Sequence, residues 1–372
     1  MVLRVLELFS GIGGMHYALR ESCCGEVVAA VDINTVANMV YAANFPQTKL
    51  LQKNIESLTA EEINKMRINA ILMSPPCQPF TRNGLQKDTA DSRTSPFLHF
   101  LKLLPELTEN LKYILLENVK GFEKSDARDK FVNILQDANF IFQEFLLSPC
   151  QFHVPNSRTR YYLIAKQRPL NFSFSTKSLV DDIIHIMDGN DRTLYETYHI
   201  NTQYRELAAA EEEENPENNT DKKTCFSLFH ILEQENADYF SSFKLPDNIL
   251  LKYACALDIV FPQSKHSCCF TKAYGHYVVG TGSVLSNESK EYVLSVAEKI
   301  KSRECESEKC LNLLHSLQLR YFTPLEIAKL MCFPQDFSFP TFVKRKQRYR
   351  LLGNSINVHV VSILIKLLVA AS

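Results

Sequence analysis

The chain has 372 residues, of which 45% are hydrophobic and 22% are charged, enough to build about two globular domains. Lys and Arg number 41 against 42 Asp and Glu, so the formal charge is −1 and a polyanionic partner would need a local basic patch. No stretch has the roughly 20 uninterrupted apolar residues of a membrane span, and the eleven cysteines include no C-x-x-C pair. These features exclude secreted, membrane and small disulfide-rich proteins. We expect a cytoplasmic protein with reduced thiols, with the nucleus as a second compartment and with no membrane partner.

Residues 3 to 166 alternate short apolar runs with amphipathic stretches. The apolar runs are Val5–Phe9, Val27–Val31, Ala70–Met73, Tyr113–Leu116 and Tyr161–Ala165. The helical candidates are Gly14–Glu21, Thr35–Asn44, Thr59–Met66, Phe97–Leu107 and Ala127–Asn139. Continuous apolar strands separated by helices predict a mostly parallel sheet that is covered on both faces, a doubly wound α/β fold. Ligands of such a sheet collect at the carboxyl ends of its strands.

The first apolar run leads into a glycine-rich turn, Phe9-Ser10-Gly11-Ile12-Gly13-Gly14, and then into a helix. Glycines let a ligand approach the backbone, and the helix N-terminus directs N–H groups at it. The turn lacks the G-x-G-x-x-G spacing of a dinucleotide site. Asp32, 18 residues after Gly14, ends the second run, where a carboxylate would accept ribose hydroxyls. We interpret the turn and Asp32 as a nucleoside-cofactor site; a generic turn followed by a helix cap is the alternative.

The third apolar run is followed by Met73-Ser74-Pro75-Pro76-Cys77-Gln78-Pro79-Phe80-Thr81. Three prolines within five residues fix φ and remove backbone donors, so this segment is neither helix nor central strand. It is a stiff loop that presents the Cys77 thiol at the ligand edge of the sheet. A cysteine attacks as thiolate, which a polar turn or a nearby cation favours. We predict that Cys77 is a nucleophile; a buried structural thiol is the alternative.

Charged groups accompany the two later apolar runs. Glu117 lies at the mouth of an apolar run, where desolvation raises the pKa of a carboxyl and lets it donate a proton. Arg158 and Arg160 share one face of an extended segment and would suit a polarised carbonyl or phosphates. Taken alone, Glu117 is equally well explained as a surface acid at a strand end. Taken alone, the two arginines are better explained as solvated charge at a strand edge.

From about residue 168 the alternation of strands and helices breaks down. Residues 206–223, ELAAAEEEENPENNTDKK, form a charged run that we predict to be a disordered loop. Residues 225–318 contain short runs such as His276–Val279 and helical pieces such as Glu288–Lys301. We therefore divide the chain into a catalytic and cofactor-binding domain at 1–168, a smaller target-recognition domain at 169–318, and a return to the first domain at 319–372.

The end of the chain carries a basic cluster and an apolar helix. The segment Lys344-Arg345-Lys346-Gln347-Arg348-Tyr349-Arg350 has five cations in seven residues, the local patch that a nucleic acid would require here. A charge run is usually only a solvated face, which is the alternative. A Gly-Asn-Ser turn that includes Asn354 and Ser355 precedes the helical stretch Val358–Leu368 and would close the cofactor pocket.

In this order, the segments LELFSGIGG, VDIN, SPPCQPFT, ENV, RTRYYL and LLGNSINV closely resemble the cytosine-5 methyltransferase family, over about 60% of the chain. Within that family the chain is most similar to the Dnmt-two branch, small eukaryotic enzymes that methylate tRNA-aspartate. It has no large N-terminal extension, and it carries the CFT triplet Cys269-Phe270-Thr271 that marks the branch. After Gly353 it departs from DNA-acting relatives, which commonly carry a proline there. The role of the triplet stays open between RNA handling and a packed Cys-Phe pair in the core.

The resemblance implies a Rossmann-like enzyme that uses S-adenosyl-L-methionine, without a metal, to methylate carbon 5 of a cytosine. Cys77 would add to C6 of the ring, Glu117 would hold or protonate N3, and Arg160, with Arg158 nearby, would hold O2. The implied cofactor contacts are Phe9, Ser10, Gly11, Ile12, Gly13, Gly14, Asp32, Ile33, Asn54, Ile55, Ser74, Asn354 and Ser355. Nucleic-acid contacts are predicted at Arg82, Lys120, Lys344, Arg345, Lys346, Arg348 and Arg350.

The implied substrate is cytosine 38 in the anticodon loop of tRNA-aspartate, bound by a monomer that turns the base out of its stack. DNA is the alternative substrate, because the motifs describe the base and the cofactor but not the sugar. A relative that binds nucleic acid without turnover is disfavoured, since Cys77, Glu117 and Arg160 occur together. A nicotinamide oxidoreductase fails on the glycine spacing and leaves the proline loop unexplained.

Overall fold

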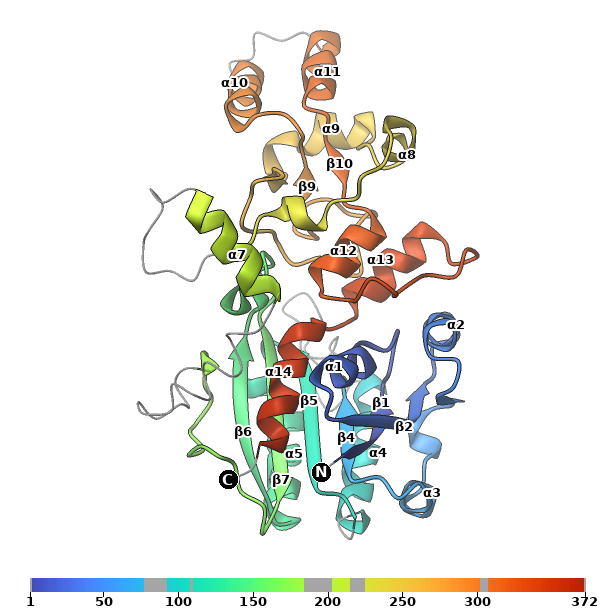
Figure 1. Ribbon diagram of the computed structural model, residues 1–372. Coiled ribbons are helices and arrows are strands. Elements are labelled where there is room, and N and C mark those ends of the chain that lie inside the picture. Colours follow the sequence, from blue (N-terminus) through green and yellow to red (C-terminus); the bar gives the residue numbers. More distant parts are fainter. Residues whose placement is uncertain are drawn as a thin grey trace.

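The computed structural model describes residues 2–76, 92–107, 110–183, 203–214, 225–301 and 307–370. Its lower domain contains a seven-stranded sheet in the order β3-β2-β1-β4-β5-β7-β6 (Figure 1). The strands are β1 Leu3–Leu8, β2 Gly25–Asp32, β3 Lys49–Gln52, β4 Ala70–Met73, β5 Tyr113–Val119, β6 Phe140–Leu147 and β7 Arg160–Gln167. β7 pairs antiparallel with both β5 and β6, and the other pairs in this sheet are parallel. The predicted doubly wound, mostly parallel sheet is confirmed.

Successive residues of a strand point to opposite faces of the sheet. Both faces of this sheet carry apolar side chains, and helices cover both. Tyr113 and Leu115 of β5 pack in the cluster that includes the first, second and last helices, whereas Ile114 and Leu116 pack in the other cluster. The helices of the first face are α1 Gly14–Ser22, α2 Thr35–Asn44 and α14 Val358–Val369. Those of the second face are α3 Ala60–Lys65, α4 Ser95–Leu103 and α5 Asp126–Asp137.

Two strands were not predicted, and each has a local reason. β3 is a four-residue edge strand whose side chains are only partly buried, so it lacks a strong apolar run. In β6 the apolar run is interrupted by Gln143 and Glu144, which are nevertheless buried. Glu144 is tolerated there because Arg128 and Tyr161 donate hydrogen bonds to its carboxylate.

The upper domain is built around a small three-stranded sheet, β10-β9-β8 (Figure 1). Its strands are β8 Ile259–Val260, β9 Val284–Leu285 and β10 Arg320–Tyr321, with helices α8 Ala237–Ser241, α9 Asp247–Tyr253, α10 Lys290–Lys301 and α11 Ser307–Ser316 around them. The predicted boundary at 318 is therefore too early, since β10 still pairs with β9. The run His276–Val279 is not a strand; a single bridge joins Tyr274 to Tyr277.

The helix α7, Gln203–Glu214, corrects the predicted disordered loop at 206–223. Alanine and glutamate are strong helix formers, and the helix is anchored: Ala208 is buried and the Tyr204 ring stacks on Phe226 at 5.8 Å between centroids. The composition of the segment shows its charge, but it does not show that Tyr204 and Ala208 pack against the rest of the protein. Residues 215–223 lie outside the described part of the chain.

The chain returns to the lower domain through α12 Pro324–Leu330, α13 Arg345–Gly353 and then α14. The stretch Arg345–Val369 is long and apolar enough to span a membrane by length and composition, but 72% of its most apolar window is buried in the protein. α14 packs against α1, as a core helix does.

A buried ion pair in the upper domain generates a stability prediction. Arg320 donates two hydrogen bonds of 2.8 Å to the fully buried Glu326. Arg320→Met removes the counter-charge, and we expect the free energy of unfolding in urea to fall by about 3–5 kcal/mol. The control is Arg4→Met, which breaks the exposed pair with Glu26 and should cost about 0–1 kcal/mol. Equal losses in the two variants would contradict this account of Glu326.

Candidate active site

A cavity of about 320 Å³ opens at the carboxyl ends of β1, β2, β4 and β5, the edge at which a parallel sheet binds ligands. The segment that links α13 to α14 closes its far wall. Predicted site residues that line this cavity are Phe9, Ser10, Gly11, Ile12, Gly14, Asp32, Ile33, Ser74, Glu117, Arg158, Arg160, Asn354 and Ser355. Residues from both ends of the chain therefore share one cavity, as the motifs predicted.

The turn between β1 and α1 is shaped by left-handed backbone at Phe9, Gly11 and Gly13. Gly11 faces open space, since a Cβ placed there would meet nothing within 4 Å. At Gly14 a Cβ would lie 2.6 Å from the Ile356 side chain, so the helix start and the C-terminal segment approach closely only because glycine stands there. The turn therefore exposes the backbone of Gly11 to the cavity, and at Gly14 it packs tightly against the C-terminal segment.

Asp32 fixes this turn from the end of β2. One carboxylate oxygen accepts the backbone N–H of Gly11 at 2.8 Å, and the other accepts that of Asn34 at 2.7 Å. Burial raises the pKa of Asp32, and these hydrogen bonds oppose the rise. Each oxygen keeps a lone pair, so the carboxylate remains able to accept two vicinal hydroxyls.

Two further features fit a nucleoside that carries an amino-acid end, such as S-adenosylmethionine. The Ser10 hydroxyl is buried and has no hydrogen-bond partner among the described residues, so it lacks the polar group that a ligand would supply. The Ile33 side chain is 66% exposed although it is apolar, and it lines the cavity as a platform for a flat ring. The residues present therefore fit the cofactor that the resemblance implies.

Three predicted cofactor contacts are not among the residues that line the cavity. Gly13 lies behind the turn, where a Cβ would meet the Phe45 ring at 2.5 Å. Asn54 instead caps the short 3₁₀ helix η1, Ile55–Ser57, by accepting the N–H of Glu56, and Ile55 is buried in the core. Neither residue lines the cavity, so the placement of Asn54 and Ile55 at the adenine edge stays a prediction.

Glu117 occupies the predicted place at the end of β5, on the cavity wall. Its carboxylate lies 3.5 Å from Nε of Arg160, and both side chains are largely buried. Burial raises the pKa of Glu117, and Arg160 and Arg158 offset only part of that rise. The carboxyl therefore holds its proton more strongly than an exposed glutamate does, as a proton donor in an apolar setting requires.

Arg158 and Arg160 both lie at the site, but they do different things. Arg158 is buried and donates from its two terminal nitrogens to the carbonyls of Phe270, Gly353 and Ser355. Most of its donors are thus committed to backbone, which makes it a positioning residue. Among the described residues, Arg160 donates to the carbonyl of only one, its neighbour Thr159. It faces Glu117 and the Cys269 sulfur on the cavity wall, so it is the arginine better placed to meet a substrate.

The sequence leaves the role of Cys269 open, and the structure places its sulfur near both arginines. Its sulfur lies 3.3 Å from Nη1 of Arg158 and 3.6 Å from Nη2 of Arg160. Burial acts to raise the pKa of the Cys269 thiol, but the two guanidinium groups outweigh it and lower the pKa. Phe270 is buried in the core, so the triplet serves packing and the site together. No local motif connects residue 269 with residues 158 and 160.

The proline loop begins at the cavity and then leaves the described part of the chain. Pro75 and Pro76 line the cavity, and the amide of Asn118 donates to the Pro75 carbonyl at 3.3 Å. Cys77 follows directly in the sequence, but it and Arg82 lie outside the described residues. The hydrogen bond between Asn118 and Pro75 therefore holds the start of this loop next to Glu117, the residue before Asn118.

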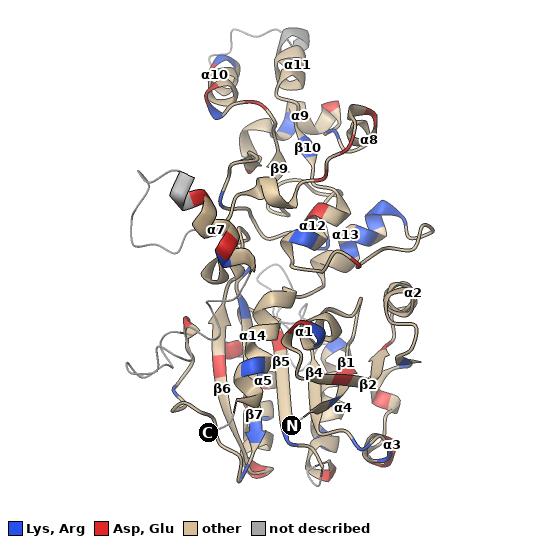
Figure 2. Cartoon of the chain, in the orientation of Figure 1, with Lys and Arg blue, Asp and Glu red and all other residues tan. Residues whose placement is uncertain are grey.

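The basic cluster at 344–350 divides into cations with internal contacts and cations without them. Arg345 bonds to Ser242 and lies over the Phe243 ring, and Arg348 donates to the Val343 carbonyl at 2.8 Å. Within the described part of the chain, the exposed side chains of Lys346 and Arg350 make no hydrogen bond or ion pair. Figure 2 shows this concentration of positive charge on α13. Lys344 and Lys120, also predicted contacts, are exposed as well.

Comparison with known proteins gives full-length similarities. The family model described as C-5 cytosine-specific DNA methylase matches residues 3–370. A Bos taurus protein named tRNA (cytosine(38)-C(5))-methyltransferase is 47% identical over 400 residues, covering 98% of this chain and 99% of its own. A Dictyostelium discoideum protein named DNA (cytosine-5)-methyltransferase is 40% identical over 376 residues, covering 99% of this chain and 94% of its own. The crystal structure of a Spodoptera frugiperda DNMT2 mutant matches with a TM-score of 0.82 at 43% identity, covering 99% and 100%.

The geometry of Asp32 generates a binding prediction. Asp32→Ala removes the acceptor for ribose hydroxyls and releases the turn at Gly11, so we expect affinity for S-adenosylhomocysteine to fall by roughly 10–100-fold. Isothermal titration calorimetry measures it. The matched control is Asp137→Ala at the exposed end of α5, which should bind like the original protein. Unchanged affinity in the Asp32 variant would show that the ribose lies elsewhere.

Proposed function

The chain belongs to the C-5 cytosine-specific DNA methylase family, which methylates carbon 5 of cytosine, and we propose that its own substrate is cytosine 38 of tRNA, with tRNA-aspartate as the target. The observation that carries this proposal is the identity over 98% of the chain to a relative named for that reaction. The identity extends through the upper domain, which we predict to recognise the target.

The cofactor site supports a nucleoside donor. S-adenosylmethionine, when bound, supplies the methyl group. Asp32 would accept its ribose hydroxyls, Ile33 would pack on the adenine, and Ser10 would meet its amino-acid end. These residues hold the donor at the ends of β1 and β2, next to Glu117 at the end of β5.

The remaining chemistry is the activation of a carbon that is a weak nucleophile. The Cys77 thiolate adds to C6 of the cytosine, and the electron pair of the C5–C6 double bond moves to C5, which takes up the methyl group. A base then removes the proton of C5 as the bond from sulfur to C6 breaks, so the double bond and the thiolate are restored. Glu117, whose carboxyl pKa is raised by burial, would donate a proton to N3, where charge builds up, and Arg160 would hold the O2 side.

An anticodon loop suits this chemistry because its bases are less firmly stacked than those of a duplex. The enzyme must bring the ring out of its stack into the pocket, and the free energy needed is lowest for single-stranded or distorted sites. Such loops also offer phosphates at close spacing to the exposed cations of α13.

DNA is the second candidate substrate, and the Dictyostelium discoideum relative named for DNA favours it. An assay with radiolabelled S-adenosylmethionine, offering total tRNA and duplex DNA at equal cytosine concentration, separates the two. We expect label in tRNA, at cytosine 38 of tRNA-aspartate by sequencing. Label only in DNA would refute tRNA as the substrate. Label in neither nucleic acid would refute methyl transfer to both candidate substrates.

Replacing Glu117 tests its role as proton donor. Glu117→Gln preserves the shape of the side chain but removes the acidic proton, so we expect methyl transfer to slow by roughly 10²–10⁴-fold. S-adenosylhomocysteine should still bind normally, since no cofactor hydroxyl depends on this group. Glu106→Gln, at an exposed position, serves as the control. A rate unchanged from the original enzyme would reduce Glu117 to a structural strand end.

The exposed cations of α13 generate a prediction about salt. Lys346→Glu combined with Arg350→Glu should weaken tRNA binding and reduce the slope of log K against log salt by roughly 1.5, the share of two phosphate contacts. A filter-binding series from low to high salt measures the slope. Lys102→Glu with Lys130→Glu, on α4 and α5, is the charge-matched control. If both double variants keep the original slope, the phosphates run along another surface.

A further inference from the structure

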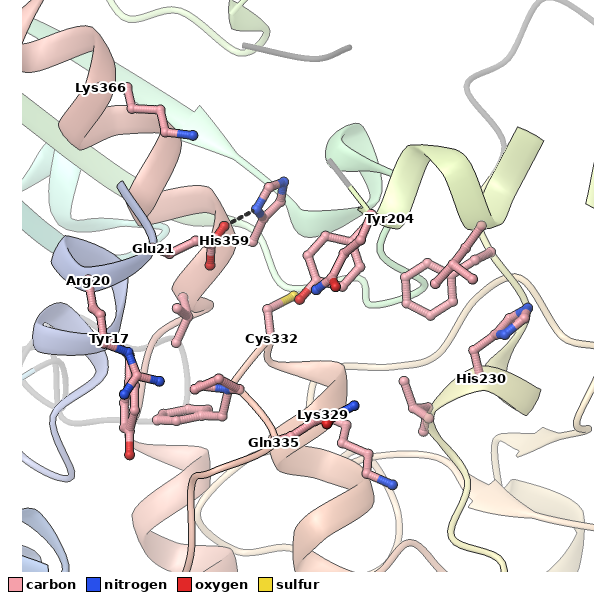
Figure 3. A pocket seen from close by; sticks show the side chains of 17 residues that line it. Tyr17, Arg20, Glu21, Tyr204, His230, Lys329, Cys332, Gln335, His359 and Lys366 are labelled. Atoms are coloured by element: carbon pink, nitrogen blue, oxygen red, sulfur yellow. Dashed lines mark hydrogen bonds and ion pairs between the residues drawn. The ribbon is translucent and has the colours of Figure 1, made fainter. Parts of the chain in front are cut away.

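A second cavity, of about 730 Å³, lies where the two domains meet and shares no lining residue with the cofactor cavity. Its walls come from α1, α7, the segment that includes the 3₁₀ helix η10 Leu228–Ile231, the end of α12 with the loop after it, and α14. Figure 3 shows side chains from these elements pointing toward a common space. Its volume lies in the range of small-molecule sites, which are frequent at domain junctions.

One wall carries polar groups that lack partners. His359 lies between Glu21 and Tyr204, and its Nδ1 is 2.6 Å from Oε1 of Glu21, an oxygen that also accepts the Ser362 hydroxyl (Figure 3). Nε2 of His359 is buried without a hydrogen-bond partner among the described residues, and the residue is only 3% exposed. The second carboxylate oxygen of Glu21 likewise receives no hydrogen bond from them. Such groups are normally paired.

Glu21 remains ionised in this setting. Burial acts to raise the pKa of its carboxyl, but the hydrogen bonds from His359 and Ser362 and the nearby Lys366 outweigh burial and lower the pKa. The free oxygen of Glu21 is therefore a strong acceptor for hydroxyl groups, in the same way as the Asp32 carboxylate in the cofactor cavity.

Aromatic rings form the other walls. Tyr204 and Phe226 lie nearly parallel at 5.8 Å, and Tyr204 meets the His359 ring edge-on at 4.8 Å. Tyr17 and Phe333, also in the lining, contact each other at 5.5 Å. Tyr204 is the partly exposed ring of this set, whereas Tyr17, Phe226 and Phe333 are at most 4% exposed, so a flat heterocycle would pack beside Tyr204.

Two ammonium groups remain available for an anion. Lys329 and Lys366 form no hydrogen bond or ion pair with the described residues, and Figure 3 places them at opposite ends of the cavity. Arg20, by contrast, already binds Asp336 through two hydrogen bonds, and the His230 ring lies 2.9 Å from a carboxylate oxygen of Glu211. Lys366 already acts electrostatically on the Glu21 carboxylate, so the phosphate of a ligand would supply a counter-charge mainly to Lys329.

We propose that this cavity is a second binding site, for a nucleotide. The base would lie among the aromatic rings, a ribose hydroxyl would donate to the free oxygen of Glu21, and the phosphate would pair with Lys329 or Lys366. The ligand chemistry is shared by a free nucleotide and by one nucleotide of an RNA strand. The site does not depend on methyl transfer, because it has its own walls and its own charges.

The test uses the full chain saturated with S-adenosylhomocysteine, so that the cofactor cavity is closed to nucleotides. Guanosine and adenosine 5′-monophosphate, a five-nucleotide single-stranded RNA, adenosine and inorganic phosphate are titrated by calorimetry. Binding of a monophosphate identifies a free nucleotide, and binding of the RNA alone identifies a strand. In either case, Lys329→Ala with Lys366→Ala should raise the Kd at least roughly tenfold.

The control is Lys102→Ala with Lys130→Ala, which removes two exposed ammonium groups from α4 and α5. Thermal unfolding of each variant checks that the fold is intact, and methyl transfer to tRNA is measured separately, so the two proposals fail independently. Three results would overturn the site: no binding by the monophosphates or the RNA, binding unaffected by the Lys329 and Lys366 substitutions, or adenosine or phosphate alone binding as tightly as the nucleotide.

Discussion

The buried guanidinium of Arg158 joins three stretches of chain that are far apart in the sequence. Its own backbone leads into β7, and its side chain donates to the carbonyl of Phe270 in the upper domain and to those of Gly353 and Ser355 ahead of α14. An arginine buried without such partners would cost several kcal/mol. The protein can therefore bury this charge only when the upper domain and the C-terminal segment are both in place, and the active site forms at the same time.

The cofactor cavity and the base-facing groups depend on that junction in different ways. Gly353 and Ser355, held by Arg158, line the cavity next to the start of α1. Arg160, two residues further along, reaches Glu117 and the Cys269 sulfur. The cavity wall and the predicted base-binding groups thus belong to one continuous set of contacts.

The sequence allowed the central strands and the glycine turn with Asp32 to be predicted because each is encoded locally, in a buried apolar run or a short spacing. The edge strand β3 and the interrupted strand β6 lacked that signal. Composition alone indicated disorder at 206–223, whereas the packing of Tyr204 on Phe226 holds the first half of that stretch in a helix. The partnership of Cys269 with the arginines could not be foreseen, since it joins residues more than a hundred positions apart. Likewise, no sequence pattern separates the cations of 344–350 that bind within the protein from those that face solvent.

In the proposed reaction, the Cys77 sulfur becomes bonded to C6 of the target cytosine. The most direct measurement uses tRNA-aspartate with 5-fluorocytosine at position 38, which has no proton at C5 to lose, so the bond between protein and RNA persists after methylation. Mass spectrometry of the digested complex should find the nucleotide attached to Cys77. Attachment to Cys269, whose lowered pKa makes it the competing thiol within the site, or no covalent complex at all, would contradict the account.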